Sequence, residues 1–150
     1  MGESLFIRKK LTLAQRGLRE LFQEEFAPRL SIAISPLEGM LFDFLCDSGS
    51  ESATEASAEF NLNKSTLSEA FYSLEKKGLI DSFVSEEDKR KKRLVVTERG
   101  WRFFEETNRL HAEFEREVAE MMGGADKRDR LLESLDLLND ALSRRKDGRN

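Results

Sequence analysis

The chain has 150 residues, with 25 Lys and Arg against 29 Asp and Glu, and its formal net charge is −4. Its 39% apolar content and 11 Phe exclude a disordered chain, and the length suits one domain with a sizeable core. One Cys and one His exclude a disulfide framework and a clustered zinc site. Because neither a membrane-spanning apolar run nor a secretory leader pattern is present, we expect a cytoplasmic protein without membrane contact.

Catalytic motifs are missing from the sequence. It has no hydrolase nucleophile elbow, no phosphate-binding glycine-rich loop and no zinc-protease helix. Carboxylates are abundant, but their spacing does not distinguish a catalytic pair from a solvated helix face. We therefore expect no enzyme activity, no catalytic residues, no metal and no cofactor.

The first predicted element is an amphipathic helix over residues 5–27. Apolar residues such as Leu11, Leu18 and Phe26 recur there at helical spacing, with charged residues between them. Pro28 lacks the backbone N–H that would continue the helix, so we expect the helix to end there.

Two further helix starts follow. Ser35 as N-cap, Pro36 at the first helical position and Glu38 two residues later predict a capping box, and this helix should stop near Cys46. A second box-like start at Ser52 predicts a short helix to about residue 60.

A tight turn separates this short helix from the next one. Asn61 tolerates the left-handed conformation, and Asn63 can cap a helix over residues 64–77. Gly78 is the expected residue after its end. The helix has one apolar face, formed by Leu67, Ala70, Phe71 and Leu74.

The period then changes to that of strands. Residues 79–84 and 93–97 are β-branched or aromatic runs that predict a hairpin with a charged tip. Five consecutive basic residues, from Lys89 to Arg93, lie at this tip in a chain that is acidic overall. A hairpin tip can be charged merely to stay soluble, but alternating charges would serve that purpose, so a single sign favours nucleic-acid binding.

Helical periodicity returns over residues 98–122. Gly123 and Gly124 should end this helix, and Asp126 is expected to cap a last helix over residues 126–143. The expected fold class is mainly α (α+β): residues 35–97 form a winged helix-turn-helix, and residues 1–34 with 98–150 form a helical dimerisation region, within one composite domain.

The winged arrangement predicts which residues meet DNA. The second helix of a helix-turn-helix can enter the major groove, and small polar residues near its amino end suit that role. The expected recognition-helix contacts are Lys64, Ser65, Thr66, Ser68, Glu69 and Tyr72. The expected wing contacts are Asp88, Lys89, Arg90, Lys91, Lys92 and Arg93.

Three motifs make the chain resemble the MarR family of bacterial transcription regulators over most of its length. They are Asp88-Lys89-Arg90 with Leu94 to Thr97 and Gly100, the run Asn63 to Ser68, and the run Leu74 to Ile80. The resemblance implies a homodimer on double-stranded DNA. It further implies that Arg90 enters the minor groove, that Asp88 orients the wing, and that Ser65, Thr66 and Ser68 face the major groove.

Two residues depart from the family pattern. Glu69 and Ser73 stand in the recognition helix where members often have Arg. A carboxylate repels phosphate, although Glu can also accept from the amino group of cytosine. The departures leave a second hypothesis open, in which the chain is a winged-helix protein-interaction module with weak or no DNA binding.

Dimerisation is expected because the terminal helices carry apolar faces that a small winged domain cannot cover. A twofold dimer would place two recognition helices about one duplex turn apart, roughly 34 to 36 Å. The alternative is a monomeric helical bundle appended to the wing domain. The expected dimer contacts are Leu11, Leu18, Leu110, Phe114, Leu131, Leu135 and Leu138.

Three further features allow two interpretations each. Cys46 is either a thiol sensor or a buried, inert side chain, and His111 either responds to pH or is an ordinary partly exposed residue. Trp101 and Phe104, with Phe103, either line a pocket for a small-molecule effector or belong to the core.

Overall fold

A computed structural model describes residues 6–49, 53–90 and 92–148. The chain divides into two compact units, which we call the winged unit (Met1–Asn108) and the C-terminal unit (Arg109–Asn150). Among the described helices, none is both long and apolar enough to cross a membrane.

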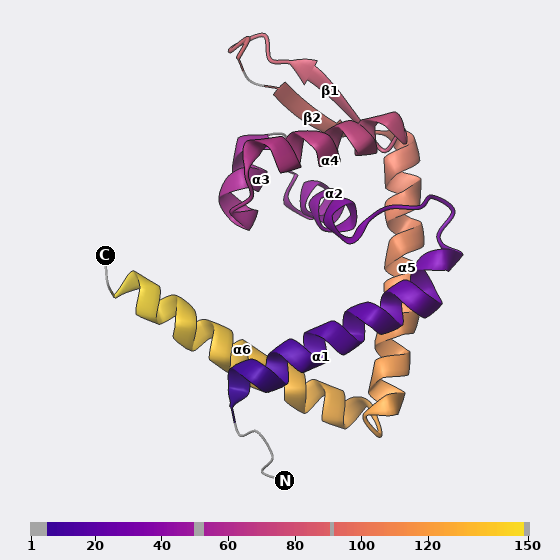
Figure 1. Ribbon diagram of the computed structural model, residues 1–150, viewed down its shortest axis with the longest axis vertical. Helices are drawn as coiled ribbons and strands as arrows, with labels where there is room; N and C mark the ends of the chain where they lie inside the picture. The colour runs from indigo at the N-terminus through magenta and orange to yellow at the C-terminus, as the bar shows by residue number, and fades with distance from the viewer. Residues whose placement is uncertain (1–5, 50–52, 91, 149–150) are drawn as a thin grey trace. The chain divides into compact units, whose positions relative to one another are not determined.

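The described elements confirm the expected mainly helical class with one two-stranded hairpin (Figure 1). In chain order they are α1 (Ile7–Leu21), a π-helical turn (Phe22–Phe26), a 3-10 turn (Ala27–Arg29), α2 (Pro36–Ser48), α3 (Ala53–Phe60), α4 (Lys64–Lys76), β1 (Ile80–Val84), β2 (Lys92–Val96), α5 (Glu98–Met121) and α6 (Ala125–Asp147).

The capping signals of the winged unit are confirmed. The Ser35 hydroxyl accepts from the Glu38 backbone N–H at 3.1 Å, and Glu38 Oε1 accepts from the Ser35 N–H at 3.2 Å. Asn61 adopts a left-handed φ of 50°, and the Asn63 side chain accepts from the Thr66 N–H at 2.8 Å. The predicted start at Ser52 lies outside the described residues.

Three helix boundaries differ from the prediction. Regular α-helix in the first element stops at Leu21 and continues as a π turn and a 3-10 turn that contains Pro28. The second predicted helix runs past Cys46 to Ser48, because the residue that ends it is Gly49, with a left-handed φ of 62°. Gly124, not Asp126, is the N-cap of α6. Its φ of 131° suits glycine, while Asp126 lies in the first turn, where the helix dipole favours a carboxylate.

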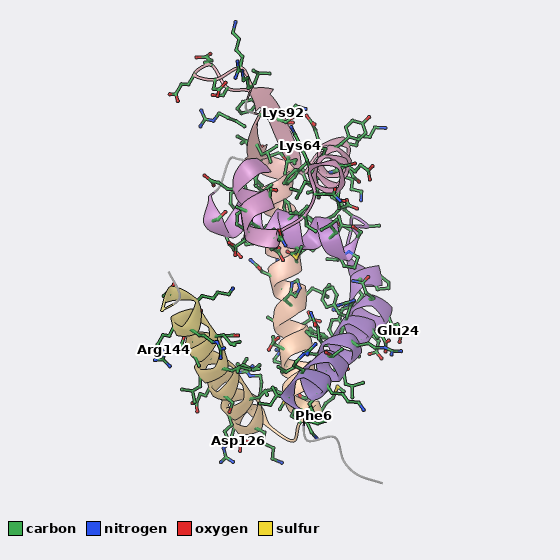
Figure 2. All side chains as sticks on the ribbon, turned by 60° about the vertical axis from the view of Figure 1, so that its left-hand side comes forward. Phe6, Glu24, Lys64, Lys92, Asp126 and Arg144 are labelled. Atoms are coloured by element: carbon green, nitrogen blue, oxygen red, sulfur yellow. The ribbon has the colours of Figure 1, made fainter. Side chains whose placement is uncertain are left out.

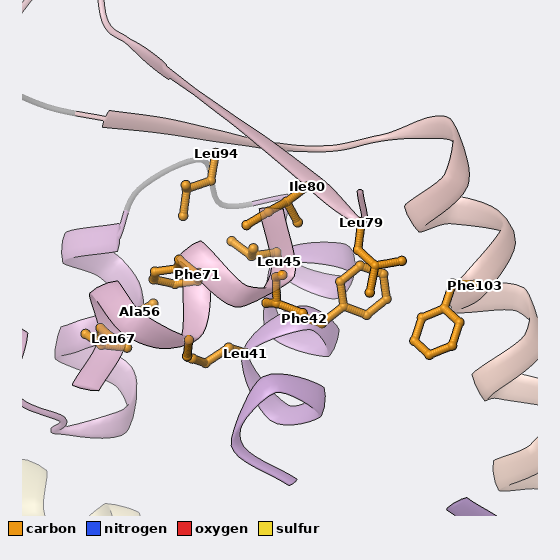
Figure 3. Close-up of a cluster of buried hydrophobic side chains, with 12 residues drawn as sticks. Leu41, Phe42, Leu45, Ala56, Leu67, Phe71, Leu79, Ile80, Leu94 and Phe103 are labelled. Atoms are coloured by element: carbon orange, nitrogen blue, oxygen red, sulfur yellow. The ribbon is translucent and has the colours of Figure 1, made fainter. Parts of the chain in front are cut away.

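The core of the winged unit forms where α2, α3, α4 and the hairpin meet the start of α5. Figure 3 shows Ile80 and Leu94 reaching from the strands toward Phe71 and Leu45 on the helices. The Phe42 ring lies 5.8 Å from that of Phe103 on α5. The buried cluster comprises Leu41, Phe42, Leu45, Ala56, Leu67, Ala70, Phe71, Leu74, Leu79, Ile80, Leu94 and Phe103.

A short polar network fixes the base of the hairpin. The Thr97 hydroxyl donates to the Gly78 carbonyl at 2.6 Å and accepts from the Gly100 N–H at 2.9 Å. Gly78 has a φ of +75°, and a Cβ on Gly100 would collide with the Leu79 carbonyl oxygen. The Thr and Gly of the wing motif therefore have structural roles at the junction of β2 and α5.

Candidate nucleic-acid interface

One face of α4 is docked on the core and the other is open. Leu67, Ala70, Phe71 and Leu74 are buried, as the helical spacing predicts. Of the expected contact residues, Thr66 is half-buried, whereas Lys64, Ser65, Ser68, Glu69 and Tyr72 are exposed. The helix therefore presents a polar surface along its amino-terminal half.

The aromatic ring on this surface has a cationic neighbour. Tyr72 is 60% exposed, and the Lys76 ammonium lies 5.5 Å from its ring centroid. That distance is typical of a cation–π contact, which holds both side chains on the open face. The exposed face of α4 thus continues past the small polar residues as an aromatic and basic surface.

The β1–β2 hairpin carries the basic run at its tip. The strands are antiparallel with Ile80 opposite Val96 and Val84 opposite Lys92, and in Figure 1 the hairpin lies beside α4 and extends beyond it. The tip residues that are described are exposed, including Asp88, Lys89 and Arg90.

The turn at the tip has its own hydrogen bonds. Asp88 Oδ1 accepts from the Arg90 backbone N–H at 3.0 Å, and the Asp88 N–H lies 3.4 Å from the Ser85 hydroxyl. An aspartate that binds the backbone two residues later forms a compact turn. This geometry holds the backbone of Arg90 while its side chain stays exposed. Lys91 lies outside the described residues.

Both surfaces belong to the winged unit and face solvent. Figure 2 labels Lys64 at the start of α4 and Lys92 at the start of β2, both in the same part of the molecule. In the register of the hairpin, Arg93 pairs with Phe83, and both side chains are exposed. The open face of α4 and the basic tip are thus presented by one core.

A buried carboxylate that the sequence did not reveal joins α2 to α4. Glu38 Oε2 accepts from the Lys77 ammonium at 2.6 Å and from the Ser73 hydroxyl at 3.1 Å. Burial opposes ionisation, but the hydrogen bonds from Lys77, the Ser35 N–H and Ser73 outweigh it and lower the pKa of Glu38. Ser73 therefore has a structural partner inside the winged unit.

Four side chains, for which the sequence allows two interpretations each, differ in burial: Cys46, His111, Trp101 and Phe104. Cys46 is half-buried, and burial with the nearby carboxylates of Asp43 and Asp47 raises its pKa to about 12, so the thiol is protonated at neutral pH. His111 is exposed on α5. Phe104 is half-buried against the core, with the Trp101 ring 5.8 Å away, and Trp101 is 46% exposed.

The expected dimer contacts differ in exposure. Leu11 and Leu18 on α1 and Leu131 on α6 are exposed, and Leu135 and Leu138 are half-buried. Leu110 and Phe114 on α5 are already buried in the single chain. Neither α1 nor α6 contains a fully buried residue.

No protein-family model and no curated protein matches the chain. Its structure, however, is similar to solved winged-helix regulators. It matches the crystal structure of MarR at 18% identity over 97% of both chains, with a TM-score of 0.79.

Two other similar structures bear on ligands: one is bound to DNA, and the other belongs to a protein whose DNA binding a small molecule regulates. The transcriptional repressor CouR bound to a 23-mer DNA duplex matches at 24% identity, over 89% of this chain and 92% of its own, with a TM-score of 0.75. BpsR of Bordetella bronchiseptica, whose DNA binding is regulated by 6-hydroxynicotinic acid, matches at 17% identity over 93% and 97%, with a TM-score of 0.72. The chain therefore has the MarR-like winged-helix fold.

Proposed function

We propose that this chain is a homodimeric, sequence-specific transcription regulator that binds double-stranded DNA through α4 in the major groove and the β1–β2 wing in the minor groove. The observation that carries the proposal is the pairing of an open polar face on α4 with an exposed basic tip on the adjacent hairpin, both fixed to one core. The MarR-like fold supports it, since CouR, which shares that fold, was solved on a duplex.

The amino-terminal half of α4 supplies the major-groove contacts. Ser65, Thr66 and Ser68 are short and can both donate to and accept from base edges. Lys64 stands at the first position of the helix, where the positive end of the dipole also favours phosphate. These residues position the helix and read sequence at the same time.

The wing supplies most of the positive charge. Arg90 enters the minor groove, where the negative potential is strongest in narrow A-tract segments. Lys89, Lys91, Lys92 and Arg93 bind phosphates. Asp88 contributes through the turn that it closes with the Arg90 N–H.

Glu69 makes the recognition face selective. Glu69 is exposed beside Ser68, and its carboxylate repels the phosphates of the duplex. Sequences in which no base donates a hydrogen bond to this carboxylate are therefore bound less tightly. A cytosine amino group can donate to its carboxylate, so the operator of this regulator carries cytosine opposite Glu69. Tyr72 is exposed on the same face and is a further expected DNA contact.

The dimer forms through residues 1–34 and 98–150. A 15-residue α1 and a 23-residue α6 without a buried residue leave apolar side chains open in the single chain. A second copy covers them and places two α4 helices on successive major grooves. The regulator works in the cytoplasm, and an effector pocket beside Trp101 and Phe104 is its candidate control site, by analogy with the ligand-regulated BpsR.

The test is duplex binding by the purified protein, titrated from low to high salt, with genomic fragments that include the region upstream of its own gene. We expect saturable binding that weakens steeply with salt, and a loss of about 10-fold in affinity for Arg90→Ala. Arg145→Ala removes the same charge from an exposed position on α6, past the expected dimer contacts, and serves as the control.

The competing hypothesis is a protein-interaction module. The exposed Glu69 and the net charge of −4 favour it, as do the exposed Phe83 and Val95 on the wing. Absence of duplex affinity at every salt concentration would support the module. Equal binding by Arg90→Ala and the wild type would show that the wing assignment is wrong.

A further inference from the structure

The carboxyl-terminal turn of α4 binds the hairpin as well as α2. Glu75 Oε1 accepts a hydrogen bond from the Ser82 hydroxyl at 2.9 Å, and the Ser82 backbone N–H lies 3.4 Å from the same oxygen. Both residues are half-buried. Two donors from one strand residue thus converge on one carboxylate oxygen of the recognition helix.

Ser82 lies where the hairpin leaves the core. Its partner on β2 is Leu94, which is only 4% exposed. The next pair toward the tip on that face of the hairpin is Val84 with Lys92, and both are exposed. The contact with Glu75 therefore holds the last residue pair of the hairpin that still packs against the core.

This contact adds a second point of attachment to the one at the base. Thr97 binds the Gly78 carbonyl where the strands begin, and the Glu75–Ser82 pair binds further along β1. The packing of Ile80 and Leu94 holds the hairpin on the core, and the two polar contacts at different points along it set its direction relative to α4.

Small changes in that direction matter at the tip. Ser82 pairs with Leu94, so the strand rise places Arg90, which precedes Leu94 by four residues, at most about 13 Å beyond this pair, and Asp88 at most about 20 Å beyond it. A tilt of roughly 10° would move Arg90 by about 2 Å, which is about a third of a minor groove only about 6 Å wide. The position of Arg90 thus depends on contacts far from the tip.

We propose that Glu75 and Ser82 are positioning residues that set the wing relative to α4, so that the recognition face and Arg90 reach neighbouring grooves of one duplex together. This inference rests on the proposed function. Glu75 contributes through Ser82, and its carboxylate is held on the strand by the hydrogen bond.

The first test is a double-mutant cycle on duplex binding. Ser82→Ala removes the hydroxyl without changing charge, whereas a neutral residue at Glu75 would strengthen phosphate attraction for an unrelated reason. We expect Ser82→Ala to weaken binding about 5-fold in the wild-type background and less than about 2-fold in Arg90→Ala, because the loss passes through Arg90. Ser82→Thr keeps the hydroxyl and should restore affinity.

The probe is a fluorescent duplex selected by the wild-type protein from a random library. Equal losses in both backgrounds would overturn the proposal, as would an unchanged affinity for Ser82→Ala. Thermal unfolding of each variant shows whether the fold is intact. A general loss of stability would weaken binding equally in the wild-type and Arg90→Ala backgrounds, whereas the proposal expects unequal losses.

The second test needs no DNA and separates this inference from the proposed function. Residual dipolar couplings of the backbone amides in the free protein report the orientation of β1 and β2 relative to α4. We expect Ser82→Ala to change or reduce the couplings of the hairpin while those of α4 stay the same. If the couplings of the hairpin are unchanged, the Glu75–Ser82 contact does not set its position, whether or not the wild type binds DNA.

Discussion

The helices of the winged part and the terminal helices differ in how their apolar faces are covered. In α2 and α4 the apolar stripe is buried within the same unit, with Leu41, Phe42 and Leu74 at 0% exposure. In α1 and α6 no residue is buried, and apolar side chains of the expected dimer face such as Leu18 and Leu131 are 43% and 44% exposed. Similar helical periodicity in the sequence therefore leads to two different outcomes.

The difference shows what an amphipathic pattern can and cannot specify. A stripe of apolar residues predicts that a face is covered, but not by which partner. For α4 the partner lies in the same unit, since α2 and β1 both contact it. For α6 the half-buried Leu135 and Leu138 leave room for a second chain, which is the basis of the proposed dimer.

Substitution of one leucine from each region tests the comparison most strongly. Leu74→Ala should lower the free energy of unfolding by about 3 to 4 kcal/mol, because it opens a cavity in a filled core. Leu137→Ala, at a position 70% exposed, should change it by less than about 0.5 kcal/mol. Urea unfolding followed by circular dichroism measures both, and equal effects would mean that α6 is as tightly packed as the winged core.

Charges on the apolar stripe of α6, formed by Leu131, Leu135 and Leu138, test dimer formation. Leu135→Asp combined with Leu138→Asp should convert a dimer of twice 17.3 kDa into a monomer and lower duplex affinity about 100-fold, since one half-site then binds alone. Light scattering gives the mass, and Leu137→Asp is the control for an added carboxylate outside the stripe. A wild-type mass of 17.3 kDa would instead support the monomeric bundle.

The local signals were predictable because they depend on neighbours in sequence. The capping box of Ser35 and Glu38, the left-handed Asn61 and the Asn63 cap all involve residues within three or four positions of each other. The order of helices and the hairpin then indicated the winged fold. The cap of α6 was missed because Gly124 and Asp126 are both plausible caps, and only the backbone angle decides between them.

The polar contacts of α4 could not be predicted from the sequence. Glu38 lies 35 residues from Ser73 and 39 from Lys77, so no spacing rule connects them. Sequence alone assigned Glu38 to the capping box and interpreted Ser73 as a departure on a DNA-binding face. In the structure the same glutamate serves both the cap and the contact with α4, and Ser73 is half-buried beside it.

The double role of Glu38 predicts the smallest of the three effects, and it depends on pH. Because hydrogen bonds hold its pKa below the ordinary value, the ionised carboxylate stabilises the fold above the unfolded-state pKa, and this contribution is lost as pH falls through the folded value. Glu38→Gln should lower the free energy of unfolding by about 1 to 2 kcal/mol at pH 7. The difference from the wild type should shrink in acid, as measured by urea unfolding at a series of pH values. Glu59→Gln, at an exposed position on α3, should have little effect at any pH, and a Glu38→Gln difference that stays constant down to low pH would contradict the role of the ionised carboxylate.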